Sequence, residues 1–337
     1  MMVSIRRARS VLVFIIAVGG LCDCAVDAPA PGSAPQTDDA GGPAATDAGG
    51  FAFGDGGADA PAQTTCDPNV RPVFVLTYAN PAQIYSFDPE TLTYKHVVDV
   101  VCPNTTGWEA STMSVDRTYH AWVVWGGTTM PFNKRLDRLD LATGACEPDV
   151  APLPTPVAPS NFGMAFATDA KNGTSESLYF TDAGGWLFRL GTSTTLGQYY
   201  KFQQGEGTQF SGIELSGSGE GRLFNFIMNY SIQYGHPCTA QDPCVPTVHI
   251  GEVDKTNGSA ISNVSVPTIP SFMLTPGGFA FAQWGGLLWA FESLNFGTTK
   301  VYAYDPVTQK AVLKNSTGPK GIVGAGVSTC APFTPPN

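Results

Sequence analysis

A short turn that follows a strand-like run recurs along the chain and limits the possible folds more than any other feature. At four places an Asp opens the turn and a Thr follows two or three residues later. An Asp at the first position accepts backbone N–H bonds, and a Pro at the second fixes the backbone angle there. The turns are Asp88–Thr91, Asp140–Thr143, Asp254–Thr256 and Asp305–Thr308. They follow the runs 84–87, 136–139, 248–253 and 301–304, and a fifth run, 186–190, is followed by Gly191.

A second set of strand-like segments has the same spacing. Five segments begin roughly 46 to 66 residues apart, and four of the five begin with Gly, as expected where backbones crowd around an axis. The segments are 110–115, 163–168, 212–217, 278–283 and 324–329. Four strands at this period predict an all-β fold, a five-bladed β-propeller. The segment 73–101 lacks an inner strand and 324–329 lacks the strands that follow, so the two ends should complete one blade and close the ring.

The pattern over residues 70–330 resembles the broad class of WD40, quinoprotein and kelch-like propellers. The Trp-Asp dipeptide of WD40 repeats is absent, so the resemblance assigns no particular family. It implies a fold and leaves the activity open, because propellers carry many unrelated functions.

The composition agrees with strands and argues against a nucleic-acid partner. Only 14% of the 337 residues are charged, and no stretch of a dozen residues has helical periodicity. Residues 66–337 carry 15 Lys and Arg against 21 Asp and Glu. A nucleic-acid-binding surface needs the opposite balance of charge.

The first 65 residues predict export and a tether. Three Arg residues precede the apolar run 11–18, which is the layout of a signal peptide and is shorter than a membrane span. We interpret residues 1–22 as the signal peptide, 23–65 as a disordered linker rich in Ala, Pro, Gly and Asp, and 66–337 as the propeller. The leader resembles those of bacterial lipoproteins, which implies a lipid on Cys22 or Cys24 and a place in the cell envelope. An ordinary secretory signal is the alternative.

Six cysteines remain in the predicted propeller, and an even number in an exported chain indicates disulfides. Cys66 and Cys330 lie at the two ends of the predicted ring and should pair across the closure. Cys238 and Cys244 are six residues apart and should pair locally. Cys102 follows the last strand of the first predicted blade and Cys146 lies in the last strand of the second, so these neighbouring outer positions should form the third bond. Other pairings, or reduced cysteines, are the alternative.

Residues with the chemistry of a catalytic site are few. The four histidines lack zinc-ligand spacing, and neither a nucleophile elbow nor a phosphate-binding loop is present. We therefore expect no metal and no cofactor. Glu214 is the exception, because the aligned positions in the other inner strands are Thr or small residues. With Glu109 it could form the carboxyl pair of a glycoside hydrolase, a class that includes five-bladed propellers.

Aromatic residues gather in loops that should share one face of the ring. By resemblance, ligands of propellers bind on the face formed by the loops between second and third strands and the loops leading into inner strands. The candidates there are Trp108, Phe132, Tyr230, Tyr234, His236 and Phe296. Such rings could bind protein, peptide or glycan, or they could pack between blades. The primary expectation is a binding or scaffold protein without catalysis, and a glycan-active enzyme is the alternative.

Overall fold

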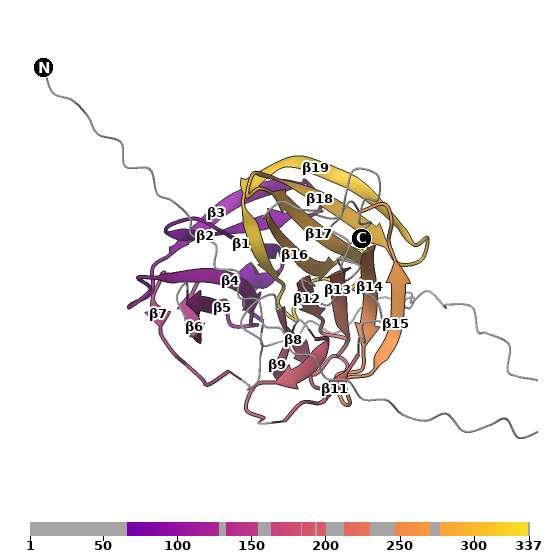
Figure 1. Cartoon of the computed structure of the whole chain (residues 1–337), viewed down its shortest axis with the longest axis horizontal. Helices are drawn as coiled ribbons and strands as arrows, with labels where there is room; N and C mark the ends of the chain where they lie inside the picture. Colours follow the sequence, from indigo (N-terminus) through magenta and orange to yellow (C-terminus); the bar gives the residue numbers. More distant parts are fainter. Residues whose placement is uncertain are drawn as a thin grey trace, which may run out of the picture. The chain divides into compact units, whose positions relative to one another are not determined.

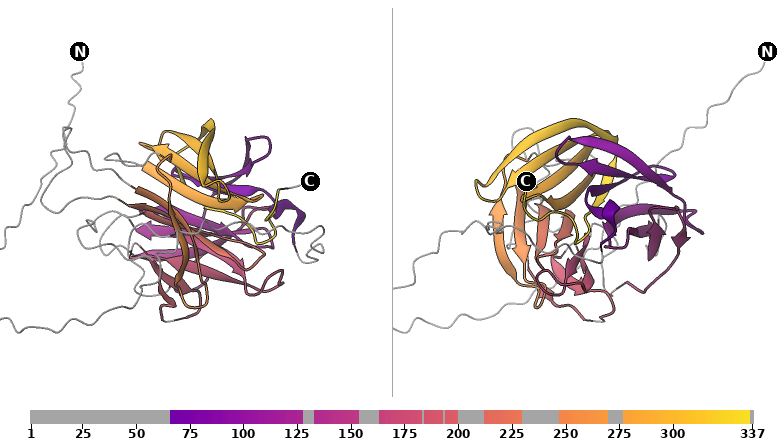
Figure 2. Two further views of the ribbon diagram at one scale, coloured as in Figure 1. Left: turned by 90° about the vertical axis from the view of Figure 1, so that its right-hand side faces the viewer. Right: turned by 180° about the vertical axis from the view of Figure 1, so that it is seen from behind.

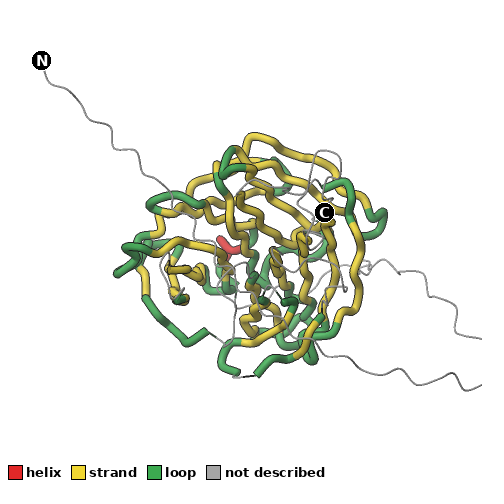
Figure 3. The backbone as a smooth tube through the Cα atoms, viewed as in Figure 1, coloured by secondary structure: helices red, strands yellow, loops and turns green. Residues whose placement is uncertain are grey.

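The computed structural model describes residues 66–127, 133–153, 163–182, 184–192, 194–199, 212–229, 247–269 and 277–335. Nearly all of the regular structure in these ranges is β-strand (Figure 3), and the helix seen there is one short 3-10 turn, η1 (Pro68–Val70). The strands form five four-stranded antiparallel sheets, which are the five blades of a propeller (Figure 1). The five-bladed all-β prediction is confirmed.

Each blade runs from an inner strand near the ring axis to an outer strand at the rim, as Figures 1 and 2 show. From the first blade to the fifth, the inner strands are β20 (Ile322–Gly326), β4 (Trp108–Val115), β8 (Met164–Thr168), β12 (Gly212–Gly217) and β16 (Gly277–Trp284). The second strands are β1 (Val73–Thr77), β5 (His120–Gly127), β9 (Glu176–Thr181), β13 (Leu223–Asn229) and β17 (Leu287–Leu294). The third strands are β2 (Ala82–Asp88), β6 (Lys134–Asp140), β10 (Trp186–Arg189), β14 (Thr247–Val253) and β18 (Thr298–Asp305). The outer strands are β3 (Thr93–Val100), β7 (Cys146–Glu147), β11 (Gly197–Gln198), β15 (Ala260–Ser265) and β19 (Lys310–Lys320).

The two ends of the propeller share the first blade, as predicted. The inner strand β20 comes from the end of the chain and pairs antiparallel with β1, with Phe74 opposite Gly326. The closing strand begins and ends earlier than the predicted 324–329. It starts after Gly321, which has φ +67, and ends at Gly326, after which the backbone turns so that the Ala331 N–H bonds to the Ser328 carbonyl.

Disulfides fix both the closure and one blade junction. Cys66 and Cys330 are bonded across 264 residues, and Cys102 and Cys146 are bonded between the first and second blades. Both pairings were predicted. Cys238 and Cys244 lie outside the described residues.

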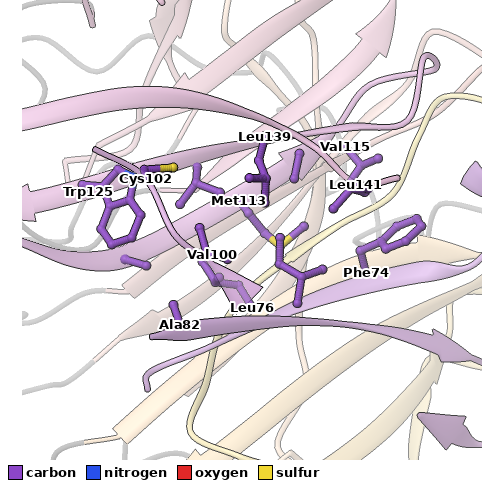
Figure 4. Close-up of a cluster of buried hydrophobic side chains, with 14 of the residues drawn as sticks. Phe74, Leu76, Ala82, Val100, Cys102, Met113, Val115, Trp125, Leu139 and Leu141 are labelled. Atoms are coloured by element: carbon purple, nitrogen blue, oxygen red, sulfur yellow. The ribbon is translucent and has the colours of Figure 1, made fainter. Parts of the chain in front are cut away.

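Hydrophobic clusters fill the interfaces between successive blades. Figure 4 shows the cluster between the first and second blades, where Leu76 and Val100 face Met113 and Leu139. Corresponding clusters join the second to the third blade, the third to the fourth, the fourth to the fifth and the fifth to the first. Because one face of each sheet packs on the next blade, burial of apolar side chains holds the ring together.

Small residues let the inner strands approach one another at the axis. A Cβ on Gly217 would lie 2.0 Å from the Phe166 carbonyl oxygen, and one on Gly326 would lie 2.8 Å from the Ser114 Cα. Neither position has room for a side chain. Of the four glycines that begin the predicted inner-strand segments, Gly163, Gly278 and Gly324 also stand where backbone of a neighbouring blade lies in contact. A Cβ on Gly163 would lie 2.4 Å from the Glu214 Cα, and one on Gly278 would lie 2.1 Å from the Ile322 carbonyl oxygen.

Candidate binding face

The loops of the ring divide between two ends because the strands of each blade alternate in direction. One end carries the loops between second and third strands and the loops into inner strands. We call it the Tyr78 face, after the residue that follows β1. The opposite end carries the other loops and the Cys66–Cys330 bond, and we call it the clasp face.

Three blades bring side chains together around Tyr78. Its hydroxyl donates a hydrogen bond of 2.6 Å to Glu109 Oε1 at the start of the second blade. Its ring stacks on Phe296 of the fifth blade, with centroids 4.4 Å apart and planes 24° from parallel. Its backbone N–H bonds to the carbonyl of Gly321, just before the closing strand. The cluster therefore spans the fifth, first and second blades.

The Tyr78 cluster is open to solvent and chemically asymmetric. The Tyr78 side chain is 40% exposed, and Glu109 is exposed beside it. The hydrogen bond to Glu109, together with partial burial, raises the pKa of Tyr78 to about 12, so the hydroxyl keeps its proton at neutral pH. A ligand would meet an apolar ring next to a carboxylate that still has acceptor capacity.

The backbone that presents Phe296 is unusual. Asn295 and Phe296 both have φ of +52, in the left-handed region that bulky residues avoid. Backbone of this kind persists where the surrounding structure enforces it, and it occurs often at binding sites. Here the turn between β17 and β18 holds the Phe296 ring against Tyr78.

Trp108 forms a more enclosed part of the same face. The Arg135 guanidinium lies 5.6 Å from the centroid of its ring and is held by a 2.6 Å ion pair to the fully buried Asp137. Asp137 also accepts a hydrogen bond from the Asp149 backbone N–H. Trp108 is half-buried against the hydrophobic cluster between the first two blades, so part of its role is packing.

The Cys102–Cys146 disulfide lies next to Asp137. Ligand-type atoms of the three residues are within 4.8 Å of one another, the one such group found in the described part of the chain. Both sulfur atoms belong to the disulfide, so neither is a thiolate that could bind a metal.

Lys134 and Asp182 interact electrostatically on the Tyr78 face, between the second and third blades. Burial lowers the pKa of Lys134 to about 7, and the nearby Asp182 carboxylate opposes that shift. Asp182 is only 8% exposed, and burial raises its pKa although the N–H groups of Gly184 and Trp186 donate to it. Lys134 can therefore change its charge near neutral pH.

Glu214 projects into the crowded centre of the ring. It is 3% exposed and accepts one hydrogen bond, of 3.4 Å, from the Thr112 hydroxyl. Thr112 stands at the aligned position of β4, two blades away, so the two side chains meet across the axis. Burial raises the pKa of Glu214 well above its usual range, partly opposed by Thr112.

The clasp face has its own polar closure. Arg117 is 5% exposed; its Nε donates to Thr329 Oγ1 at 3.2 Å and lies 3.7 Å from Glu176 Oε2. The Thr329 hydroxyl donates to Glu176 at 2.7 Å. This buried network joins the loop after β4 to the start of β9 and to the residue beside Cys330.

The structure describes only some of the residues that the sequence predicted for the ligand face. Phe296 lies in the Tyr78 cluster beside Glu109, the residue named above as a catalytic candidate, and Trp108 lies against the neighbouring blade interface. Phe132, Tyr230, Tyr234 and His236 lie outside the described residues. Sequence reasoning missed Tyr78 and Lys134. Tyr78 could have been found as the aromatic residue that follows the strand beside the closure, whereas the burial of Lys134 leaves no mark in the sequence.

No helix in the described ranges is long and apolar enough to cross a membrane.

No family model matches the chain, and no curated protein matches it in sequence. Among solved structures, the chain is similar to AofleA from Arthrobotrys oligospora, at 9% identity, a TM-score of 0.41 and coverage of 76% of this chain and 72% of that one. TolB from Acinetobacter baumannii is 13% identical with a TM-score of 0.36, and the match covers 76% of this chain and 57% of TolB. Oligopeptidase B from Leishmania major is 10% identical with a TM-score of 0.30, and the match covers 75% of this chain and 33% of the oligopeptidase.

Proposed function

We propose that this protein is an exported propeller, tethered to a membrane by a lipid on Cys22 or Cys24, that binds a ligand of the cell envelope on its Tyr78 face without converting it. The ligand is a protein, a peptide or a glycan. The propeller acts as a rigid scaffold that positions loops from different blades.

The observation that carries the proposal is the cluster of Tyr78, Glu109 and Phe296. An exposed aromatic ring, backed by a second ring and hydrogen-bonded to a carboxylate, is more than blade packing requires. Binding surfaces in general combine aromatic rings with a few fixed polar groups. The loops after β1 and β17 and the start of β4 are fixed to one another by the ring, so little conformational freedom would be lost when a ligand binds.

Export is supported by two separate parts of the chain. The leader has the layout of a signal peptide, and both disulfides between described cysteines need an oxidising compartment to persist. The linker 23–65 would hold the propeller away from the membrane surface.

The glycoside hydrolase alternative gains no support from Glu214. Such enzymes place two carboxyl groups on either side of an accessible bond. Glu214 is 3% exposed and bonded to Thr112. We therefore keep hydrolysis as an alternative that the activity measurement below would reveal.

Binding is tested with the mature protein on a glycan array and by pull-down from envelope extracts. Tyr78→Ala combined with Glu109→Gln should weaken retention of the ligand at least tenfold. Tyr85→Ala, which removes a half-exposed ring from β2 of the same blade, is the matched control and should bind like the wild type. Equal binding by all three proteins would move the site away from Tyr78, and turnover of a bound glycan would favour the enzyme.

Anchoring is tested by fractionation and mass spectrometry of the mature chain. We expect the mature chain to begin with a lipid-modified Cys22 or Cys24 and to fractionate with the membrane. Replacing the modified cysteine with Ser should release the protein from the membrane. A mature start without a modified cysteine would rule out the lipid anchor while leaving export intact.

A further inference from the structure

Two neighbouring hairpins expose apolar side chains at the clasp end of the ring, where their outer strands β15 and β19 begin (Figure 1). Ile261, Val307, Val312 and Leu313 are 50–69% exposed. The first lies at the start of β15, and the other three lie in the β18–β19 hairpin. The other exposed large apolar side chains of the described ranges lie toward the Tyr78 face, and they are Tyr78, Val101, Trp186 and Leu294. At the clasp end, such side chains are therefore confined, in the described part of the chain, to the fourth and fifth blades.

The Asp305 turn directs its carboxylate back onto the turn itself and leaves an apolar side chain at the tip. Asp305 accepts hydrogen bonds from the Val307 N–H at 2.8 Å and from the Thr308 hydroxyl at 2.9 Å. The corresponding turns of the first and second blades form the same backbone bond with Glu90 and Ala142 in place of Val307. The geometry of the turn therefore does not require an exposed valine at this position.

Lysines accompany the apolar residues of the β18–β19 hairpin. Lys310 and Lys314 are exposed, and neither forms an ion pair within the described ranges. Glu90 lines a surface pocket with Lys314 and offsets part of its charge, whereas Asp305 is engaged by its own turn. The hairpin thus combines an apolar tip with cationic side chains, although the whole chain has a net charge of −10. Segments of this composition bind the interface of membranes that contain anionic lipids.

The shape of the hairpin favours a bilayer over a protein partner. Val312 lies opposite Ala303 and Leu313 lies opposite Tyr302, so these consecutive side chains point to opposite faces of the sheet. A protein partner needs one continuous complementary surface, whereas a fluid bilayer can surround a protruding tip on all sides. The linker proposed above also joins the propeller at this end, because Cys66 lies on the clasp face. A tether of this kind keeps the clasp end near the membrane and raises the effective concentration for a weak contact.

We propose that the β18–β19 hairpin, together with Ile261 of the fourth blade, is a membrane-contact site that inserts its apolar tip among the headgroups of a bilayer containing anionic lipids. The linker lets the propeller stand away from the membrane between contacts, and the hairpin draws the clasp end onto the surface. The Tyr78 face then points away from the bilayer, where its ligand can reach it. The contact adds to the lipid anchor proposed above and does not depend on it.

Vesicle co-sedimentation tests the proposal with residues 25–337, which lack both leader cysteines and contain every described residue. Vesicles of phosphatidylcholine and phosphatidylglycerol in a three-to-one ratio should retain this protein. Val307→Asp should weaken retention at least threefold, and Val307→Asp combined with Leu313→Asp should weaken it at least tenfold. The matched controls are Val101→Asp, at a residue 66% exposed where Val307 is 69% exposed, and Val101→Asp combined with Leu294→Asp. These controls lie at the opposite end of the ring and should stay within twofold of the wild type.

The lipid dependence separates the two parts of the contact. Vesicles of phosphatidylcholine alone should retain the protein at least threefold less, because they lack the anionic headgroups that attract the lysines. Lys310→Gln combined with Lys314→Gln should remove most of this preference for phosphatidylglycerol.

No retention by the mixed vesicles, or equal losses in Val307→Asp and Val101→Asp, would overturn the proposal. Self-association of the protein without vesicles, if Val307→Asp abolished it, would overturn it too, because the hairpin would then contact a second copy of this chain. The assay uses a chain without a lipid anchor, so its failure would leave the proposed anchor and the Tyr78 site intact. Likewise, a mature protein without a modified cysteine would leave the vesicle result intact.

Discussion

Single residues in the turns between third and outer strands carry a measurable backbone cost. Gln309 closes the Asp305 turn with φ +55, where the equivalent residue of the Asp254 turn is Gly258 with φ +68. A residue with a Cβ pays about 1–2 kcal/mol for this conformation, whereas Gly pays none. The turn motif predicted where each turn begins, but its last position accepts Leu, Gly or Gln, so the strain was not predictable from it.

We predict that Gln309→Gly stabilises the protein by about 0.5–1 kcal/mol, because the strain relieved exceeds the extra entropy of Gly in the unfolded chain. Gly258→Ala should destabilise it by more than about 1 kcal/mol, since the added Cβ would also lie 2.6 Å from the Gly197 nitrogen. Urea unfolding of the two variants measures both. Opposite signs support the account, and a loss of stability in Gln309→Gly would contradict it.

Glu214 should make the free energy of unfolding depend on pH. Its pKa is raised from 4.5 by burial, so the folded protein holds this proton at pH values where the unfolded chain has released it. Its contribution is therefore fully present below pH 4.5 and is lost as pH rises from there through the folded pKa. Glu214→Gln should remove this slope and be more stable than the wild type at high pH. Urea unfolding at pH 5, 6, 7 and 8 compares them, and parallel curves would show that Glu214 does not titrate as described.

At the scale of strands and turns, local sequence patterns predicted where the elements lie, but they did not predict which side chains meet across the ring. The strands, the Asp turns and the inner-strand glycines repeat within about fifty residues, so their positions followed from the sequence. The Tyr78 cluster joins residues 78, 109 and 296 from three blades, and the sequence carries no signal for which side chains meet there. Glu214 stood out in the alignment of inner strands, but its burial depended on how closely the strands pack.

Substitutions at Arg117 and Glu176 test how much the ion pair between the loop after β4 and the start of β9 stabilises the clasp face. Arg117→Met would leave the partly buried Glu176 carboxylate, whose side chain is 11% exposed, without its cation. Breaking a fully buried pair typically costs about 3–5 kcal/mol, so we expect a loss at or below the lower end of that range. Adding Glu176→Gln removes the uncompensated charge, so the double variant should be more stable than Arg117→Met alone. Denaturant unfolding of the four proteins gives the coupling, and additive losses would show that the two side chains act independently.

For the whole molecule, the covalent closure is the strongest constraint on the unfolded chain. In the chain-entropy description, a bond across 264 residues contributes up to about 5.6 kcal/mol, and one across 44 contributes up to about 4 kcal/mol. Replacing Cys66 and Cys330 with Ala should therefore cost more stability than replacing Cys102 and Cys146. Guanidinium unfolding of the two double variants decides the order, and the reverse order would show that the closure adds little beyond the blade contacts.

The central claim is an exported propeller whose first blade is built from both ends of the chain and locked there. Peptide mapping of the protein isolated from the envelope under non-reducing conditions tests it most directly. We predict a single linked pair of peptides that contains Cys66 and Cys330. Free thiols at both positions, or a bond from either one to another cysteine, would contradict the closed ring and the oxidising compartment together.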